Sequence, residues 1–189
     1  PLRRAWLQVT VEDAGGALVF ASGRADARGR ILGGDGAPLA SERLGGPVEP
    51  HRQVVGSSDE VQIWEAGMED SHGRPTWSLL AGAAYQKDNR LLPRGWDPAH
   101  PSAQVIGAIG TEADAGFAGG ADRVRYAVAA PAERGPFTVR AELLYQTAGA
   151  RFLEELFAAE TAETERFRRM WEAAPRRPER MAAVAYRVE

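Results

Sequence analysis

The sequence predicts a mainly β fold: an antiparallel β-sandwich, immunoglobulin-like, with about seven to eight strands and a helical pair inserted before the last strand. Three observations support this prediction. Apolar and polar residues alternate in several stretches, clusters of Gly, Pro and Asp separate them, and the apolar period becomes helical over about 149–174. A length of 189 residues suits one domain, so we expect residues 1–189 to form a single β-sandwich domain.

The N-terminal part predicts a hairpin. In residues 4–11, apolar side chains occupy every second position, and the alternation resumes at Leu18 and Phe20 after a Gly-containing turn. Residues 23–59 lose this periodicity and are rich in Gly and Pro. We therefore expect a long loop there, with one short edge strand near Gln53–Val55.

Two further strands are predicted in the middle of the chain. Residues 61–65 alternate, and a turn separates them from a strand at 77–85. The Leu79-Leu80 pair and the small residues after it indicate burial on both faces, which places this strand at the centre of a sheet. A second long loop follows over 87–120, with a short strand expected at 104–109.

The C-terminal part predicts two strands, two helices and a last strand. Residues 124–128 alternate over a short stretch, and residues 137–145 form the clearest alternating stretch of the chain. The helical pair follows, with Thr161 in position to cap the second helix. The last strand carries apolar residues at every second position over 184–188, so we expect it to return to the sheet and bury that side.

Composition excludes several classes of function. The net charge is −3 with 26 acidic and 23 basic residues, so we expect no nucleic-acid partner. The chain has no cysteine, which excludes disulfides, thiolate metal sites, a cysteine nucleophile and covalent haem attachment through CxxCH in this segment. No apolar run approaches the length of a membrane span, so we expect no span in this segment.

Candidate catalytic and metal-binding residues are few. The serines lack a Gly-x-Ser-x-Gly elbow, so we predict no catalytic residue. The three histidines are not at paired spacing, so we predict no metal site. Pro50 stiffens the backbone before His51, and Glu49 is near enough to orient its ring. Two interpretations of His51 stay open: a ligand of a metal or of haem iron, or a hydrogen-bonded loop residue. In the isolated domain we expect His51 to be solvent-accessible and without a ligand. Asp35, Asp70 and Asp114 lie in Gly-containing loops without EF-hand spacing and read as turns.

A polar corner interrupts the middle of the chain after residue 86. We predict that it is structural, because Asn89 can hydrogen-bond nearby backbone, Asp88 can pair with an arginine, and Pro and Gly end any regular element. Its residues are Lys87, Asp88, Asn89, Arg90, Pro93 and Gly95.

Six segments taken together resemble one family. They are Arg3-Arg4-Ala5-Trp6-Leu7 with Val9-Thr10-Val11; Glu49-Pro50-His51; Val61-Gln62-Ile63-Trp64-Glu65; Lys87-Asp88-Asn89-Arg90-Leu91-Leu92-Pro93-Arg94-Gly95; Gly119-Gly120-Ala121-Asp122-Arg123-Val124-Arg125-Tyr126; and Ala141-Glu142-Leu143-Leu144-Tyr145-Gln146. The pattern resembles the C-terminal, non-haem β-sandwich domain of bacterial multihaem c-type cytochromes.

The resemblance implies a structural and interaction domain in an electron-transfer protein. In that family a haem-bearing region with CxxCH motifs lies upstream, and this chain departs from the family in lacking any such motif. The resemblance therefore implies the C-terminal part of a longer chain, with no cofactor here and c-type haem in the parent protein. It also implies a haem-bearing domain or subunit and redox proteins as partners, a periplasmic or extracellular location, and His51 as a candidate axial ligand.

Two other functions remain open at this point. The first is an independent β-sandwich binding module for a carbohydrate or a cell-surface partner. The second is an enzyme, which we consider least consistent with the residues because they contain no catalytic motif.

Overall fold

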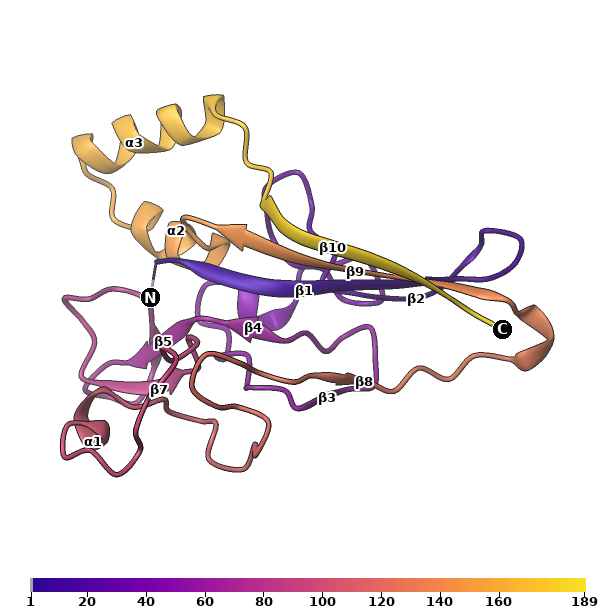
Figure 1. Cartoon of the computed structure of the whole chain (residues 1–189). Helices are drawn as coiled ribbons and strands as arrows, with labels where there is room; N and C mark the ends of the chain where they lie inside the picture. The colour runs from indigo at the N-terminus through magenta and orange to yellow at the C-terminus, as the bar shows by residue number, and fades with distance from the viewer. Residues whose placement is uncertain (1) are drawn as a thin grey trace.

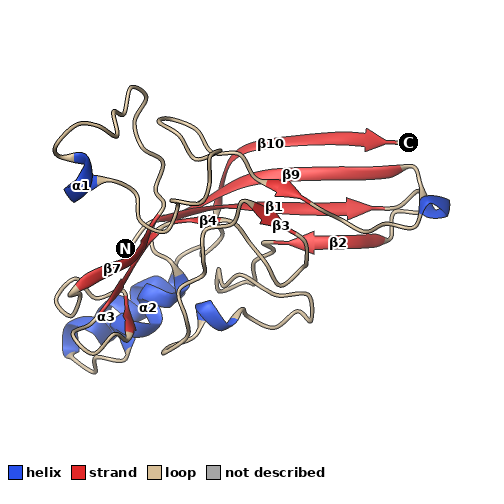
Figure 2. Cartoon of the chain, turned by 90° about the horizontal axis from the view of Figure 1, so that it is seen from below, coloured by secondary structure: helices blue, strands red, loops and turns tan. Residues whose placement is uncertain are grey.

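A long antiparallel sheet organises the molecule. The computed structural model describes residues 2–189, and in it the predicted N-terminal strand lies at the centre of this sheet (Figures 1 and 2). The strand order is β10-β9-β1-β2, and β4 pairs with β1 beside β2. The bounds are β1 Arg4–Glu12, β2 Leu18–Ser22, β4 Ile63–Trp64, β9 Phe137–Gln146 and β10 Glu179–Val188.

Short strands and loops form a second layer on one side of this sheet (Figure 1). β5, β6 and β7 form a small antiparallel sheet, whereas β3 pairs in parallel with β8. The bounds are β3 Val54–Val55, β5 Ala66–Glu69, β6 Pro75–Thr76, β7 Ala84–Asp88, α1 Ala103–Ile106 and β8 Arg125–Tyr126, with 3₁₀ turns at Ala40–Glu42 and Ala132–Arg134. The mainly β, antiparallel prediction is confirmed, and the layers are consistent with a β-sandwich.

Both faces of β1 are covered, because successive side chains of a strand point to opposite faces. One face carries Trp6, which packs in a buried cluster with Ile31, Val61, Ile63 and Leu144. The other face carries Val9 and Val11, which pack in a second cluster with Phe20 and Val55. The core is therefore divided by the long sheet into two parts.

Gly23 lets the chain pass close to β1 at the end of β2. Its φ is +75°, and a Cβ atom there would lie 2.2 Å from the carbonyl oxygen of Leu7. The carbonyl of Gly23 accepts a hydrogen bond of 2.8 Å from Nε1 of Trp6. Only glycine satisfies both the left-handed backbone and the close approach.

The helical pair lies before the last strand, as predicted. α2 (Ala150–Phe157) packs on the molecule through Glu155, whose carboxylate accepts from the backbone N–H of Trp77 at 2.9 Å, and through Arg151, which stacks 4.8 Å from the ring of Trp77. α3 (Ala162–Ala173) begins with the predicted cap at Thr161. Figure 1 shows α3 extending away from the sheet, and its residues are exposed or half-buried.

The expected central strand at 77–85 is wrong. Residues 78–83 form an exposed turn, in which the N–H groups of Ala81 and Gly82 both bond to the carbonyl of Ser78. Leu79 is 70% exposed and Leu80 is 101% exposed. Small residues after Leu80 suit a turn as well as a buried strand, and the strand itself starts only at Ala84.

Two smaller expectations also fail. Residues 103–106 form a short helix instead of the strand expected at 104–109. The last strand does return to the sheet and pairs with β9, but its apolar side is not buried by the described residues 2–189. Val184, Tyr186 and Val188 are 47%, 67% and 49% exposed, because the second layer does not extend beyond β9.

Candidate functional site

The polar corner starts at Lys87, within β7, and the chain leaves this strand at Asn89, whose side chain is buried. Asp88 pairs with the guanidinium of Arg90 at 2.5 Å on the exposed side. Further on, the N–H of Trp96 bonds to the carbonyl of Pro93 at 3.1 Å, and Gly95 within this turn has a φ of +79°. The prediction that Asp88 pairs with an arginine agrees with its contact with Arg90, whereas β7 already ends at Asp88, before Pro93 and Gly95 are reached.

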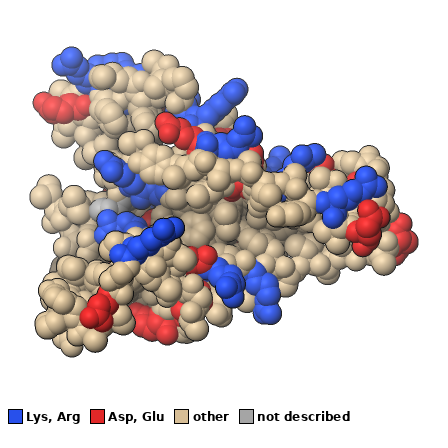
Figure 3. All heavy atoms as spheres, viewed as in Figure 1, with Lys and Arg blue, Asp and Glu red and all other residues tan. Residues whose placement is uncertain are grey.

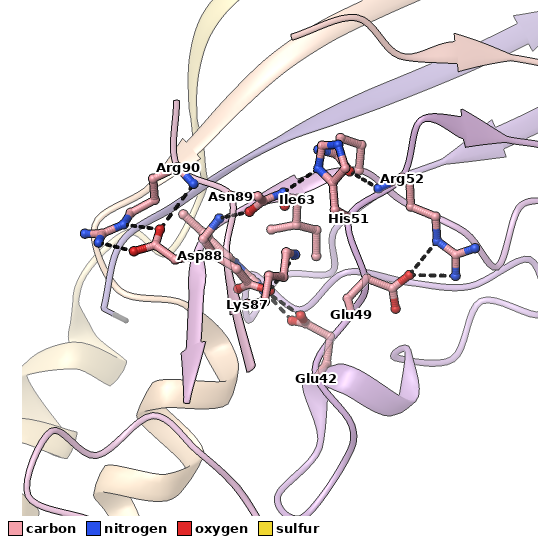
Figure 4. Close-up of polar contacts among 12 residues, drawn as sticks. Glu42, Glu49, His51, Arg52, Ile63, Lys87, Asp88, Asn89 and Arg90 are labelled. Carbon is pink, nitrogen blue, oxygen red and sulfur yellow. Dashed lines mark hydrogen bonds and ion pairs between the residues drawn. The ribbon is translucent and has the colours of Figure 1, made fainter. Parts of the chain in front are cut away.

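Asn89 is fully buried and bonds to backbone groups of a neighbouring segment. Its Oδ1 accepts from the N–H of Glu65 at 2.9 Å, and its Nδ2 donates to the carbonyl of Ile63 at 2.8 Å (Figure 4). These two groups lie on either side of the break between β4 and β5. The side chain therefore satisfies backbone groups, as the sequence predicts.

Lys87, the only lysine of the chain, is also buried. Its Nζ lies 3.5 Å from Oε1 of Glu65. Burial lowers the pKa of Lys87, although the carboxylates of Glu65 and Glu49 oppose this effect. A buried pair of this kind offsets its own desolvation cost at best, so we assign it no stabilising role.

His51 lies at the centre of a buried polar network. Its Nε2 is 2.9 Å from Oδ2 of Asp114, and its Nδ1 is 2.9 Å from Nε2 of Gln62. Nδ1 also lies 3.0 Å from Nδ2 of Asn89 (Figure 4). The edge of Phe117 packs against the ring. The side chain of His51 is only 4% exposed, so the sequence expectation that this loop histidine is solvent-accessible in the isolated domain is wrong.

The expected pairing of Glu49 with His51 is also wrong. Glu49 instead accepts from the guanidinium of Arg52 at 3.0 Å. Burial raises the pKa of Glu49 even though Arg52 counteracts it. The carboxylate that orients the imidazole comes from Asp114, which is far away in the sequence.

The network determines which imidazole nitrogen carries the proton. Oε1 of Gln62 accepts from the N–H of Arg52 at 2.6 Å, and Oδ1 of Asn89 accepts from Glu65, so both amides turn their NH₂ groups towards Nδ1. Nδ1 must therefore be an acceptor, and in the neutral ring the proton lies on Nε2 and is donated to Asp114. This tautomer follows from backbone groups that hold both amides in place.

This tautomer opposes metal or iron binding at His51. Ligand atoms of His51, Asp114 and Asp122 lie within 4.8 Å of one another, a spacing at which a metal ion could be held. Binding through Nε2 would move the proton to Nδ1, where it would face two N–H donors. The present contacts do not suit iron ligation, and the haem-ligand role of His51 stays a prediction that would require this network to rearrange.

Asp122 connects the network to an adjacent cavity. Its Oδ2 accepts from Nε1 of Trp64 at 2.8 Å and from Nε2 of Gln62 at 3.3 Å. Its Oδ1 is buried and has no hydrogen-bond partner among the described residues. Asp122 and Trp64 both line the cavity, so the network around His51 supports one of its walls.

The cavity has a volume of about 580 Å³ and is mainly apolar. Its walls come from β1, β9, the start of β10, β4 and the loops at 90–91 and 121–124. The lining residues are Arg3, Arg4, Ala5, Leu7, Trp64, Arg90, Leu91, Ala121, Asp122, Val124, Leu143, Tyr145 and Met181. This size and lining are typical of sites that bind small ligands or an anchoring group of a partner.

Charges around the cavity are mostly basic. Arg3 and Arg90 are exposed, whereas Arg4 is buried and held by Glu42 through two contacts, one of them 2.9 Å long. Asp122 is the acidic residue of the lining. On the face drawn in Figure 3, basic and acidic side chains are otherwise interspersed.

The other histidines do not join this site. His72 and His100 are exposed in turns, as their sequence context indicates. Sequence reasoning missed Gln62, Asp114 and Asp122 as partners of His51. Gln62 and Asp122 lie in segments that carry the family resemblance, but only the folded chain brings them to the ring.

No family model, no curated protein and no solved structure matches this chain. Within residues 2–189, none of the helices is both long enough and apolar enough to span a bilayer.

Proposed function

We propose that this chain is a non-haem structural and interaction domain of a periplasmic or surface multihaem c-type cytochrome involved in electron transfer. One observation carries the proposal. Five of the six segments that resemble this family line the same apolar cavity, and the remaining segment, Glu49-Pro50-His51, supports its wall through Gln62 and Asp122. Segments spread over most of the chain thus converge on one surface feature.

The chemistry of the cavity suits the edge of a haem group carried by a partner. A porphyrin edge is apolar and carries two propionate carboxylates. Leu7 and Leu143 provide apolar walls, and the guanidinium of Arg3 is suited to a carboxylate. Arg90 pairs with Asp88 in the free chain and would exchange this exposed partner for a second carboxylate. In this proposal the domain covers a haem edge and positions redox partners, while the iron ligands come from the haem-bearing region.

The test is binding to the haem-bearing segment encoded immediately upstream of this chain. We expect titration calorimetry to show binding by the wild type and by Leu80→Glu, whose side chain is fully exposed and remote from the cavity lining. Leu91→Glu places a carboxylate at the cavity and should weaken binding by at least about tenfold. No CxxCH-bearing partner, or equal binding by both variants, would overturn the proposal.

The alternative is an independent binding module, and the size and apolar lining of the cavity favour it as a second candidate. This module would bind a carbohydrate or a cell-surface partner without any haem protein. Screening the same three proteins against glycans and cell-surface fractions separates the two functions. Binding that Leu91→Glu abolishes, without binding to a cytochrome, would support the module.

A further inference from the structure

The outer edge of β10 is free along its whole length. β10 pairs with β9 on one side, and no strand among residues 2–189 pairs with its other side (Figure 2). All ten of its residues are exposed. Unpaired N–H and C=O groups at a sheet edge are a template for another strand.

The sequence of β10 provides little protection against such pairing. No charged residue occurs from Met181 to Tyr186. Natural edge strands usually carry charges, prolines or bulges in such a stretch. Here a single irregularity at Met181 and the charged residues at the two ends are the protective features.

One side of β10 continues the apolar face of the sheet. Val184 lies opposite Ala141 of β9, and Tyr186 lies opposite Val139. Ala141 and Val139 pack against the buried cluster of Val9, Val11, Phe20 and Val55. The exposed apolar residues of β10 are therefore an uncovered extension of the core.

We propose that a second copy of this chain pairs antiparallel with β10 about a two-fold axis at Ala185. The register follows from the pairing of β10 with β9, in which Arg180 lies opposite Leu144 and Ala182 opposite Leu143, so Met181 is an extra residue. Counted through this bulge, Val184 faces the partner's Tyr186 and Ala182 faces the partner's Val188. The apolar sides of both copies then form one continuous face.

Charge complementarity favours this register and favours a second copy of the same chain as the partner of β10. With the axis at Ala185, Arg180 lies opposite the partner's Glu189, and the symmetry repeats this ion pair at the other end. An axis at Val184 would instead place Arg180 opposite the partner's Arg187. An axis at Tyr186 would pair only residues 184–188 of β10, which spans Glu179–Val188, with the same strand of the partner. Arg180 and Arg187 have exposed contacts with Glu142 and Glu189, at 3.1 and 3.4 Å, that can rearrange at little cost.

The inference goes beyond the proposed function and does not depend on it. Strand pairing uses the backbone edge of β10 around Ala185, whereas partner binding uses the cavity, to which β10 contributes only Met181. Leu91→Glu tests the cavity and leaves β10 unchanged, so failure of either proposal can be told apart from failure of the other.

The first test places like charges on the axis. Analytical ultracentrifugation should show a dimer for the wild type and monomers for Ala185→Lys and for Ala185→Glu, because like charges directly opposite each other are destabilising. Mixing the two variants should restore a dimer. Circular dichroism and a cooperative thermal transition control for folding, since Ala185 is exposed; the midpoint itself should fall with the loss of the dimer. A monomeric wild type, or dimers of each variant alone, would overturn the proposal.

The second test fixes the register. The chain has no cysteine, so Ala185→Cys introduces a single thiol whose partner lies directly opposite, within about 4.5–5.5 Å between Cα atoms. Ala183→Cys is the matched control, because the two thiols would be separated by four residues, about 13 Å along the strand direction. Oxidation should cross-link the first variant and not the second. Cross-linking of Ala183→Cys instead would overturn the register.

Discussion

β1 and β10 are neighbours of the same strand and have opposite environments. They contain nine and ten residues, both carry apolar residues at every second position over part of their length, and both pair with β9. β1 is buried or half-buried throughout, whereas every residue of β10 is exposed. Alternation therefore identifies a strand and its apolar side, but burial depends on what the rest of the chain places over it.

The difference arises from the second layer. β3 and β8 lie over β1 and bring Val55 and Tyr126 onto its Val9 side. The Trp6 side is covered by residues 23–42 and 61–63. Neither β3 and β8 nor residues 23–42 and 61–63 cover β10. The centre of the sheet is therefore buried, whereas its edge strand β10 is exposed. Mutations in the two strands should separate these roles.

The largest contrast is expected between two aromatic residues. Trp6→Ala removes a fully buried side chain and the hydrogen bond to Gly23, and should cost roughly 3–5 kcal/mol of unfolding free energy. Tyr186→Ala on β10 should change it by less than about 0.5 kcal/mol in the monomeric Ala185→Lys background. Urea denaturation measures both. Equal effects would mean that β10 is buried in the free chain.

The next contrast compares two Arg–Glu pairs. Arg4→Met leaves Glu42 buried without its partner and should cost roughly 3–5 kcal/mol, whereas Arg4→Met with Glu42→Leu should cost less than the single change. Arg180→Met removes the exposed pair with Glu142 and should cost at most about 1 kcal/mol. A small effect of Arg4→Met in denaturation experiments would contradict the assignment of a buried pair.

Asn89 supports the layer that covers β1. Asn89→Leu leaves the N–H of Glu65 and the carbonyl of Ile63 buried without partners, so we expect a loss of about 1–3 kcal/mol. Gln104→Leu, at an exposed position of α1, is the matched control and should leave stability unchanged. An unchanged denaturation midpoint and slope for Asn89→Leu would refute the role of this side chain.

The helical pair should show an intermediate effect. The sequence predicts roughly 3–5 kcal/mol for Trp171→Ala if the ring is fully buried. The ring is half-buried and contacts Phe167 at 6.3 Å between ring centroids, so we expect a loss of about 1–2 kcal/mol. Thermal and urea unfolding would both detect it. A loss above this range would indicate that α3 packs more closely than its exposure implies.

The smallest effect concerns pH. Burial alone would raise the pKa of Asp114, but hydrogen bonds from His51, the N–H of Gly116 and Gln53 hold it below its ordinary value of 3.8. A lowered folded-state pKa gives stability that is present above the ordinary pKa and is lost as the pH falls through the folded value. Asp114→Asn should therefore flatten the fall in stability below about pH 4. Glu133→Gln, at an exposed position, should not.

Local patterns were sufficient for much of the fold. The stretches 4–11, 137–145 and 184–188, with apolar residues at every second position, correspond to strands, and the helical period after residue 149 corresponds to helices. The turn at 78–83 was misassigned because Leu79 and Leu80 are apolar yet exposed. Alternation and composition describe residues that are close along the chain. They therefore cannot indicate which segments are buried by residues from distant parts of the sequence.

The candidate site was less accessible to prediction. The corner was recognised because Asn89, Pro93 and Gly95 have local conformational preferences. The network of His51 was missed because Asp114 is 63 residues away from it. This contact forms because the loops at 23–59 and 87–120 meet in the folded chain. The sequence pattern within either loop does not indicate that they meet.

The side-chain carboxamide of Asn89 makes the kind of hydrogen bonds that a backbone peptide group makes in a sheet. It accepts from the N–H of Glu65 and donates to the carbonyl of Ile63, as a backbone amide would, while its second N–H faces Nδ1 of His51. The backbone N–H of Asn89 bonds to the carbonyl of Glu65 at 3.2 Å, so main chain and side chain hold the same segment. A carboxylate at this position could accept from Glu65 but could not donate to Ile63. This chain contains one asparagine, and it stands directly after the end of β7, where its side chain adds two hydrogen bonds to the one that its backbone makes with the same segment.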